Sequence, residues 1–177
     1  MIRFKLSSLA QAVAICAGAV LFVGGAGAAD TKGDKATYDQ AKASAKAAYD
    51  TDKKACDSLA GNAKDICVAE AKAKRTRTDE NAEAAYKNTP KAREHATHEI
   101  AEADYKVATE RCDDKAGNDK DVCVKEAKAA RVSTDAKVDA SKDKREADYK
   151  VAAEKCDAMT GDAKSACVKA AKAKYGM

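Results

Sequence analysis

Large apolar side chains are scarce in this sequence of 177 residues. Tryptophan is absent, both phenylalanines lie in the first 29 residues, and the only leucine beyond them is Leu59. The other large aliphatic residues there are Ile66, Ile100 and scattered valines. A chain of this composition buries little apolar surface, and small cores are marginally stable without additional links. Ordinary globular packing therefore cannot be the main source of its stability.

Residues that interrupt helices are also rare. Pro90 is the only proline, and residues 119–159 contain neither proline nor glycine. Alanine, lysine and glutamate, which favour helices, fill much of the chain. We therefore predict an all-α protein, with one helix about 60 Å long over residues 119–159 at 1.5 Å per residue. The other helices are expected at residues 36–60, 63–87, 91–116 and 163–174.

The sequence lacks the patterns of a catalytic or a nucleic-acid-binding site. It has no glycine-rich phosphate loop, and no serine is paired with a histidine. Of the 33 lysines and arginines, all but Arg3 and Lys5 lie beyond residue 29. The chain beyond residue 29 therefore has 31 basic and 29 acidic residues, and its net charge is near +2. Interspersed charges favour a solvated helical surface over the basic face that nucleic acid requires. We expect no enzyme, no cofactor and no nucleic-acid partner.

Residues 1–29 have the pattern of a signal peptide. Arg3 and Lys5 precede an apolar run at residues 9–23, and the small residues at 24–29 allow cleavage after Ala28 or one residue later. The apolar run is shorter than the ~20 residues of a membrane-spanning helix. We therefore expect export to the periplasm and no transmembrane anchor after cleavage, with an uncleaved anchor as the alternative. Residues 30–35 are expected to form a disordered leader.

Six of the seven cysteines form three evenly built pairs, while Cys16 lies in the signal segment. The pairs begin and end the stretches CDSLAGNAKDIC at Cys56–Cys67, CDDKAGNDKDVC at Cys112–Cys123 and CDAMTGDAKSAC at Cys156–Cys167. Structural zinc, the competing interpretation, uses C-x2-4-C spacing and four ligands. Ten residues between cysteines, without a nearby histidine, favour disulfides in an oxidising compartment.

Each of these stretches has the chemistry of a helical turn. A glycine stands five positions after the first cysteine, where its left-handed backbone would end a helix. The next residue is Asn or Asp, which we predict to cap the following helix. The two cysteines then face each other across antiparallel helices, and a disulfide closing a loop of this size contributes about 3 kcal/mol in the chain-entropy model. The predicted glycines and caps are Gly61 with Asn62, Gly117 with Asn118, and Gly161 with Asp162.

Counting outward from each cysteine pair predicts a coiled-coil-like seam of alanines and tyrosines. Tyr105 is expected opposite Ala130, and Tyr149 opposite Lys174 or Tyr175. The fold class is thus an array of disulfide-clipped antiparallel hairpins, elongated or loosely bundled. Residues 36–88 form the first hairpin, and residues 89–177 form the second and third, which share the long helix.

The only histidines, His95 and His98, stand three residues apart on a predicted helix. Glu94, Glu99 and Glu102 are close in sequence, so a surface site for a divalent metal is conceivable. The simpler interpretation is two solvated residues in a charged segment. A periplasmic metal-binding protein is therefore the alternative function.

The phrase C-D-x-x-x-G-x-x-K-x-x-C-V, present in all three copies, resembles small exported Ala/Lys-rich proteins of Gram-negative bacteria. The run VKEAKAAR at residues 124–131 resembles the periplasmic helical domain of the TolA family. The hairpins are also similar to plant α-hairpinins, although Asp52 and Ala71 stand where the outer cysteines of those proteins would be. The resemblance to the exported bacterial proteins implies a periplasmic location. We expect a structural, interaction or envelope-stress role, with a protein or envelope component as partner and oligomers possible.

The disulfide assignment predicts a mass. The oxidised exported protein should weigh six hydrogens less than the reduced chain, because three bonds form among its six remaining cysteines. Intact-mass spectrometry before and after reduction measures this difference. Free thiols in the exported, unreduced protein would contradict the assignment.

Overall fold

The computed structural model describes residues 32–177, so the signal peptide expected at residues 1–29 lies outside the described residues. The described part contains helices and turns and no strand, which confirms the all-α prediction. Its five helices are α1 (Lys35–Cys56), α2 (Gly61–Lys87), α3 (Pro90–Cys112), α4 (Gly117–Asp157) and α5 (Gly161–Tyr175).

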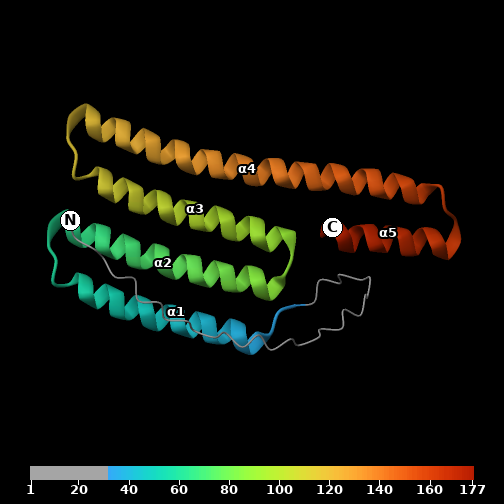
Figure 1. The fold of residues 1–177 in the computed structure, drawn as a ribbon, viewed down its shortest axis with the longest axis horizontal. Helices are drawn as coiled ribbons and strands as arrows, with labels where there is room; N and C mark the ends of the chain where they lie inside the picture. Colours follow the sequence, from blue (N-terminus) through green and yellow to red (C-terminus); the bar gives the residue numbers. More distant parts are fainter. Residues whose placement is uncertain (1–31) are drawn as a thin grey trace, which may run out of the picture.

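The helices α1 to α4 lie side by side in one antiparallel layer (Figure 1). Each helix packs chiefly against its neighbours in sequence. The long α4 extends beyond α3, and α5 folds back along this extension, in line with α3. The molecule is therefore elongated, and α4 belongs to both the second and the third hairpin.

Capping residues and turn residues explain where the helices begin and end at the positions that carry no disulfide. Asp34 caps α1 by accepting a hydrogen bond from the Thr37 backbone N–H at 2.8 Å. Between α2 and α3 the chain turns through Asn88, whose φ of 48° is left-handed, and Thr89, which caps α3. Pro90 occupies the first turn of α3, where its missing N–H costs nothing.

The interior of the layer is made of the smallest apolar residues. Alanines line the seams, and the one cysteine that precedes each of the three turns is almost fully buried. Small side chains let helices approach closely, but a buried methyl group contributes only ~0.8 kcal/mol. No charged or polar residue of the described chain is fully buried. The buried residues are Ala45, Cys56, Ala71, Ala73, Ala84, Ala92, Ala96, Ala101, Cys112, Cys156 and Ala171.

Ion pairs cross the seams between neighbouring helices. Arg77 of α2 meets Asp104 of α3 at 2.6 Å, and Arg131 of α4 meets Glu102 of α3 at 2.7 Å. Their side chains are a third to a half exposed. Because exposed pairs contribute at most about 1 kcal/mol each, these pairs set the register of the helices more than they stabilise them.

The chain before α1 departs from the expected disordered leader. The backbone N–H of Gly33 donates to the carbonyl oxygen of Tyr86 at 2.7 Å, and the Tyr38 and Tyr86 rings stack at 4.9 Å. The leader prediction is thus corrected for residues 33–35, which attach to the end of α2 or begin α1. The reason is tertiary: their partner, Tyr86, is distant in sequence.

The extension formed by the end of α4 and by α5 is attached to α3 at two points. Arg145 of α4 bonds Glu94 of α3, and these side chains are only 17% and 16% exposed. At the end of α5, a Cβ added to Gly176 would lie 2.9 Å from Pro90 Cδ, so the C-terminus meets the start of α3. Tyr149 and Tyr175 contact edge to face at 6.4 Å, as the seam predicted.

Within residues 32–177, none of the helices combines the length and the apolar character needed to span a membrane.

Replacing Arg145 by Ala should lower the free energy of unfolding by about 2 kcal/mol, because Glu94 would keep its partly buried charge without a partner. Denaturant unfolding followed by circular dichroism measures the change. The matched control is Lys144→Ala, which removes an exposed pair with Asp148 and should cost less than about 0.5 kcal/mol. Equal losses for the two variants would contradict the anchoring role of Arg145.

Candidate functional site

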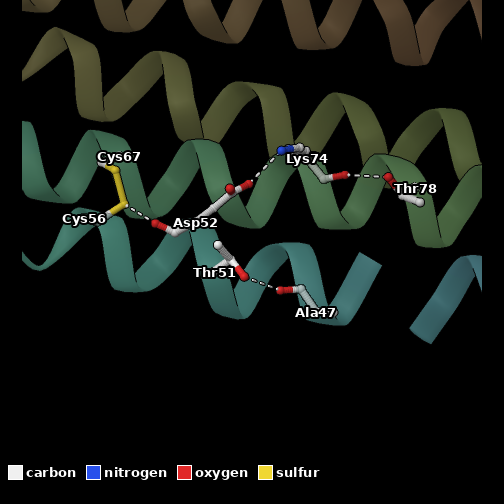
Figure 2. Close-up of polar contacts among 7 residues, drawn as sticks. All are labelled: Ala47, Thr51, Asp52, Cys56, Cys67, Lys74 and Thr78. Atoms are coloured by element: carbon white, nitrogen blue, oxygen red, sulfur yellow. Dashed lines mark hydrogen bonds and ion pairs between the residues drawn. A yellow bond between two sulfur atoms is a disulfide. The ribbon is translucent and has the colours of Figure 1, made fainter. Parts of the chain in front are cut away.

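Each of the three turns is closed by a disulfide, as predicted. The bonds join Cys56 to Cys67, Cys112 to Cys123 and Cys156 to Cys167, with a Cα–Cα distance of 5.7 Å in every copy. Figure 2 shows the first one, with the sulfur of Cys56 lying 3.2 Å from the carbonyl oxygen of Asp52. The first cysteine of each pair is at most 1% exposed, so the bond is shielded on that side.

The Cys56–Cys67 disulfide joins α1 to α2, and charged residues also pair between these two helices. Lys74 of α2 reaches across to Asp52 of α1 at 2.8 Å, one turn before the disulfide (Figure 2). Within the same helices, the hydroxyls of Thr51 and Thr78 donate hydrogen bonds to the backbone carbonyls of Ala47 and Lys74. The disulfide therefore lies at the end of a seam that is ordered by polar contacts.

The turns differ from the predicted capping pattern. The helix before each turn ends at or next to the first cysteine, four or five residues earlier than the glycine. A tight hydrogen bond then follows in each copy, such as Leu59 N–H to Cys56 O at 3.0 Å. The expected helix ends at residues 60, 116 and 159 are thus wrong, because three or four residues after the first helix are needed to reverse the chain.

The glycines have the predicted left-handed backbone but a different place in the turn. Gly61, Gly117 and Gly161 have φ values of 54°, 54° and 58° and open the second helix of each hairpin. The residue before each glycine is extended, and its side chain makes no capping bond. The capping role predicted for Asn62, Asn118 and Asp162 is therefore wrong: they lie inside the first turn, beyond the capping position.

An ion pair that the sequence interpretation missed recurs at every turn. Lys64 meets Asp57 at 2.9 Å, and the equivalent pairs Lys120–Asp113 and Lys164–Asp157 measure 2.9 and 3.0 Å. The signal was present: an Asp follows each first cysteine, and a Lys stands seven residues after that Asp. A carboxylate at a helix C-terminus is unfavourable alone, and the lysine offsets it.

The pKa values of these groups shift as such a pair requires. The hydrogen bond from Lys64 lowers the pKa of the Asp57 carboxyl. In the second copy, the bond to Asp113 raises the pKa of the Lys120 ammonium. Both pairs thus hold their charged forms across the turn.

The first turn is also joined to the second. The side-chain amide of Asn62 donates to the carbonyl oxygen of Glu110 at 3.0 Å and to the carboxylate of Asp114 at 2.7 Å. This bridge fixes the start of α2 against the end of α3. Asn62 is thus a contact between hairpins, which explains its position better than capping does.

The two histidines turn to different neighbours. His98 Nδ1 lies 2.7 Å from a carboxylate oxygen of Asp135 on α4, whereas His95 Nε2 lies 3.9 Å from Glu80 on α2. Burial raises the pKa of the Glu80 carboxyl, and the charge of nearby His95 acts in the opposite direction.

The carboxylates expected beside the histidines have other partners. Glu94 bonds Arg145, and Glu102 bonds Arg131. Across residues 32–177, no three His, Cys, Asp or Glu side chains are grouped closely enough to hold a metal ion. The structure does not bring His95 and His98 together with a shared ligand set.

One face of the layer has a shallow groove of roughly 590 Å³ over α2 and α3. Side chains of both signs line it, and some of them pair with one another: Arg75 bonds Asp79 at 3.3 Å and lies over the Tyr49 ring at 5.4 Å. A groove lined by both signs of charge selects no ligand class.

Comparisons with protein-family models, with curated proteins and with solved structures found no match to this chain.

The glycine of a clipped turn offers a clean test of backbone strain. Gly117 has a φ of 54°, and no atom lies within 4 Å of an added Cβ. Gly117→Ala should therefore cost about 1 kcal/mol of unfolding free energy through the backbone alone. Gly117→Asn is the matched variant: asparagine tolerates the left-handed region and should cost less. Equal stability of Gly117→Ala and the parent protein, measured by denaturant unfolding, would contradict the assigned turn.

Proposed function

We propose that this protein is a non-enzymatic, exported component of the bacterial periplasm with a structural, interaction or envelope-stress role. The observation that supports this most strongly is the presence of three disulfides, one across each of three turns, in a single layer of helices that pack through alanines. A layer of this kind buries little apolar surface, so its shape depends on covalent bonds.

The clips fit an oxidising compartment. Disulfides form and persist in exported proteins and are rare where thiols are kept reduced. Three bonds at equivalent turns, with the first sulfur of each pair buried, are typical of structural bonds. The signal-peptide pattern of residues 1–29 independently favours the same location.

The surface fits a structural or interaction role. Opposite charges pair along and between the helices, for example Lys46 with Asp50 at 2.7 Å and Arg111 with Glu70 at 2.6 Å. The layer leaves two long faces and two outer helix edges open to solvent. An elongated, stiffened helical layer with extended open surfaces suits a protein that contacts a partner or an envelope component along its length.

Complementation tests this role in the bacterium that encodes the chain. A strain without the gene is scored for envelope integrity, as sensitivity to detergent and EDTA, and is then supplied with variants. Cys112→Ser/Cys123→Ser opens one clip and should fail to complement, since the middle of the layer loses its shape. His95→Ala/His98→Ala is the matched control and should complement as well as the parent.

The result also separates the two candidate functions. Failure of the histidine variant alone would contradict the structural role in favour of the metal-binding alternative. Recovery of the protein from the cytoplasm with free thiols would contradict the exported location.

A further inference from the structure

The helix α5 carries positive charge that acidic residues do not balance. Its 15 residues include four lysines, and its only acidic residue is Asp162, in the first turn. By contrast, the 41 residues of α4 include ten basic and ten acidic residues. Four lysines against one aspartate give α5 a net charge of +3, which exceeds the net charge near +2 of the whole chain beyond residue 29.

Comparison with the first copy of the repeat shows which residues cause this excess. The third cysteine pair lies 100 residues after the first. With this offset, Ser165 stands where Asp65 does, and Ala170 stands where Glu70 does. The second copy, like the first, has acidic residues at both positions. The lysines, however, are present in both the first and the third copy: Lys64, Lys72 and Lys74 in the first, and Lys164, Lys172 and Lys174 in the third.

The helix beside α5 also lacks an acidic partner that the first hairpin has. Lys74 of α2 pairs with Asp52 of α1 at 2.8 Å. The equivalent residues of the third hairpin are Lys174 and Ala152, so the lysine is present without its carboxylate. Lys174 lies instead over the ring of the adjacent Tyr175, at 5.2 Å from the ring centroid.

The lysines of α5 are open to solvent. This helix lies beyond the ends of α2 and α3 and packs on α4, with Ala171 buried in the seam (Figure 1). Lys169, Lys172 and Lys174 are exposed, and none of them pairs with a carboxylate among residues 32–177. Of the four lysines, Lys164 alone has an acidic partner, Asp157. α5 therefore presents three unpaired positive charges to a partner.

The type of basic residue indicates the chemistry of that partner. Every arginine of residues 32–177 lies in α2, α3 or α4, and α5 has none. Arginine presents a rigid fork that matches a single carboxylate or phosphate, whereas lysine is a flexible point charge. Lysines without arginine fit a diffuse anionic surface better than one carboxylate of a folded protein.

Exposed apolar side chains lie close to both ends of α5. Met159, in the turn before this helix, is 44% exposed, and Met177, which follows it, is 45% exposed. Apolar groups beside lysines are a feature of helices that lie on membrane surfaces. Because α5 has no tryptophan, phenylalanine or leucine, we expect it to remain among the lipid headgroups, held chiefly by charge.

We propose that α5 binds the anionic surface of a lipid membrane through Lys169, Lys172 and Lys174. Each lysine close to such a surface strengthens binding about fivefold. The contact uses the end of the molecule that lies far from the first two disulfide-closed turns (Figure 1). The first two hairpins therefore stay free for other contacts.

This contact names the envelope component of the structural role proposed above, and it rests on that role for the exported location. Membrane binding is measured on the purified, oxidised chain with vesicles, whereas the structural role is measured by complementation. Either result can therefore fail while the other stands.

Co-sedimentation with lipid vesicles tests the contact. Vesicles of phosphatidylglycerol and phosphatidylcholine in equal amounts supply an anionic surface, and vesicles of phosphatidylcholine alone supply a neutral one. The oxidised parent protein should bind the anionic vesicles and not the neutral ones. Binding should weaken steeply as salt is raised to about 0.5 M, because salt screens exposed charges.

Replacing the three unpaired lysines of α5 by glutamine should weaken binding about 100-fold, from about fivefold for each lysine. The matched control removes three exposed, unpaired lysines of α2 and α4, so that the net charge falls equally, and it should bind within about twofold of the parent. The α5 variant is Lys169→Gln/Lys172→Gln/Lys174→Gln, and the control is Lys72→Gln/Lys125→Gln/Lys128→Gln.

A second variant restores the acidic residues of the first copy and keeps every lysine. Ser165→Asp/Ala170→Glu should weaken binding about tenfold, because each new carboxylate repels the anionic surface. Circular dichroism checks that the variants keep their helices. Weakened binding in a variant that retains all its lysines identifies charge as the cause.

A parent protein that does not bind anionic vesicles, or that binds neutral ones equally well, would overturn the proposal. Equal weakening in the control variant would overturn the assignment to α5. Soluble polyglutamate serves as a further probe. If it binds through the three lysines while vesicles do not bind, α5 recognises an acidic protein and the membrane assignment is wrong.

Discussion

The disulfide across each turn is the constraint on which the rest of this structure depends. A single layer of helices gives each helix only one or two neighbours, and alanine seams contribute little burial per residue. Closing each hairpin covalently removes conformations from the unfolded chain instead of adding contacts to the folded one. The polar contacts then determine the register: the Asp–Lys pair at each turn, Asn62 between turns, and Arg145 at the extension.

Features governed by local chemistry could be predicted from the sequence. Paired cysteines ten residues apart predicted the hairpins and their disulfides, and the glycines predicted the left-handed residue of each turn. The long helix followed from the absence of helix breakers over residues 119–159. Counting along the seam placed Tyr149 against Lys174 or Tyr175, and the structure has it against Tyr175, because antiparallel helices of regular pitch keep their register from a fixed point.

Features governed by neighbours distant in sequence could not be predicted. The helices end before the expected residues because chain reversal requires three or four residues, and Asn62 contacts the next hairpin instead of capping its own helix. His95 and His98 lie on the same helix, but each is near a carboxylate of a different neighbouring helix: Glu80 of α2 for His95 and Asp135 of α4 for His98. A pattern on one helix cannot show which helix packs beside it. The metal site considered at His95 and His98 and the predicted capping residues both rested on such patterns.

Unfolding of the oxidised and the reduced protein under identical conditions tests the central claim most directly. Circular dichroism in a denaturant series, with and without a strong reductant, measures the helical signal and the midpoint. If the clips hold the layer, reduction lowers stability by about 3 kcal/mol for each opened loop, and the reduced chain loses its cooperative transition. Superimposable curves for the two forms would contradict this account, because alanine seams and ion pairs alone would then suffice to maintain the fold.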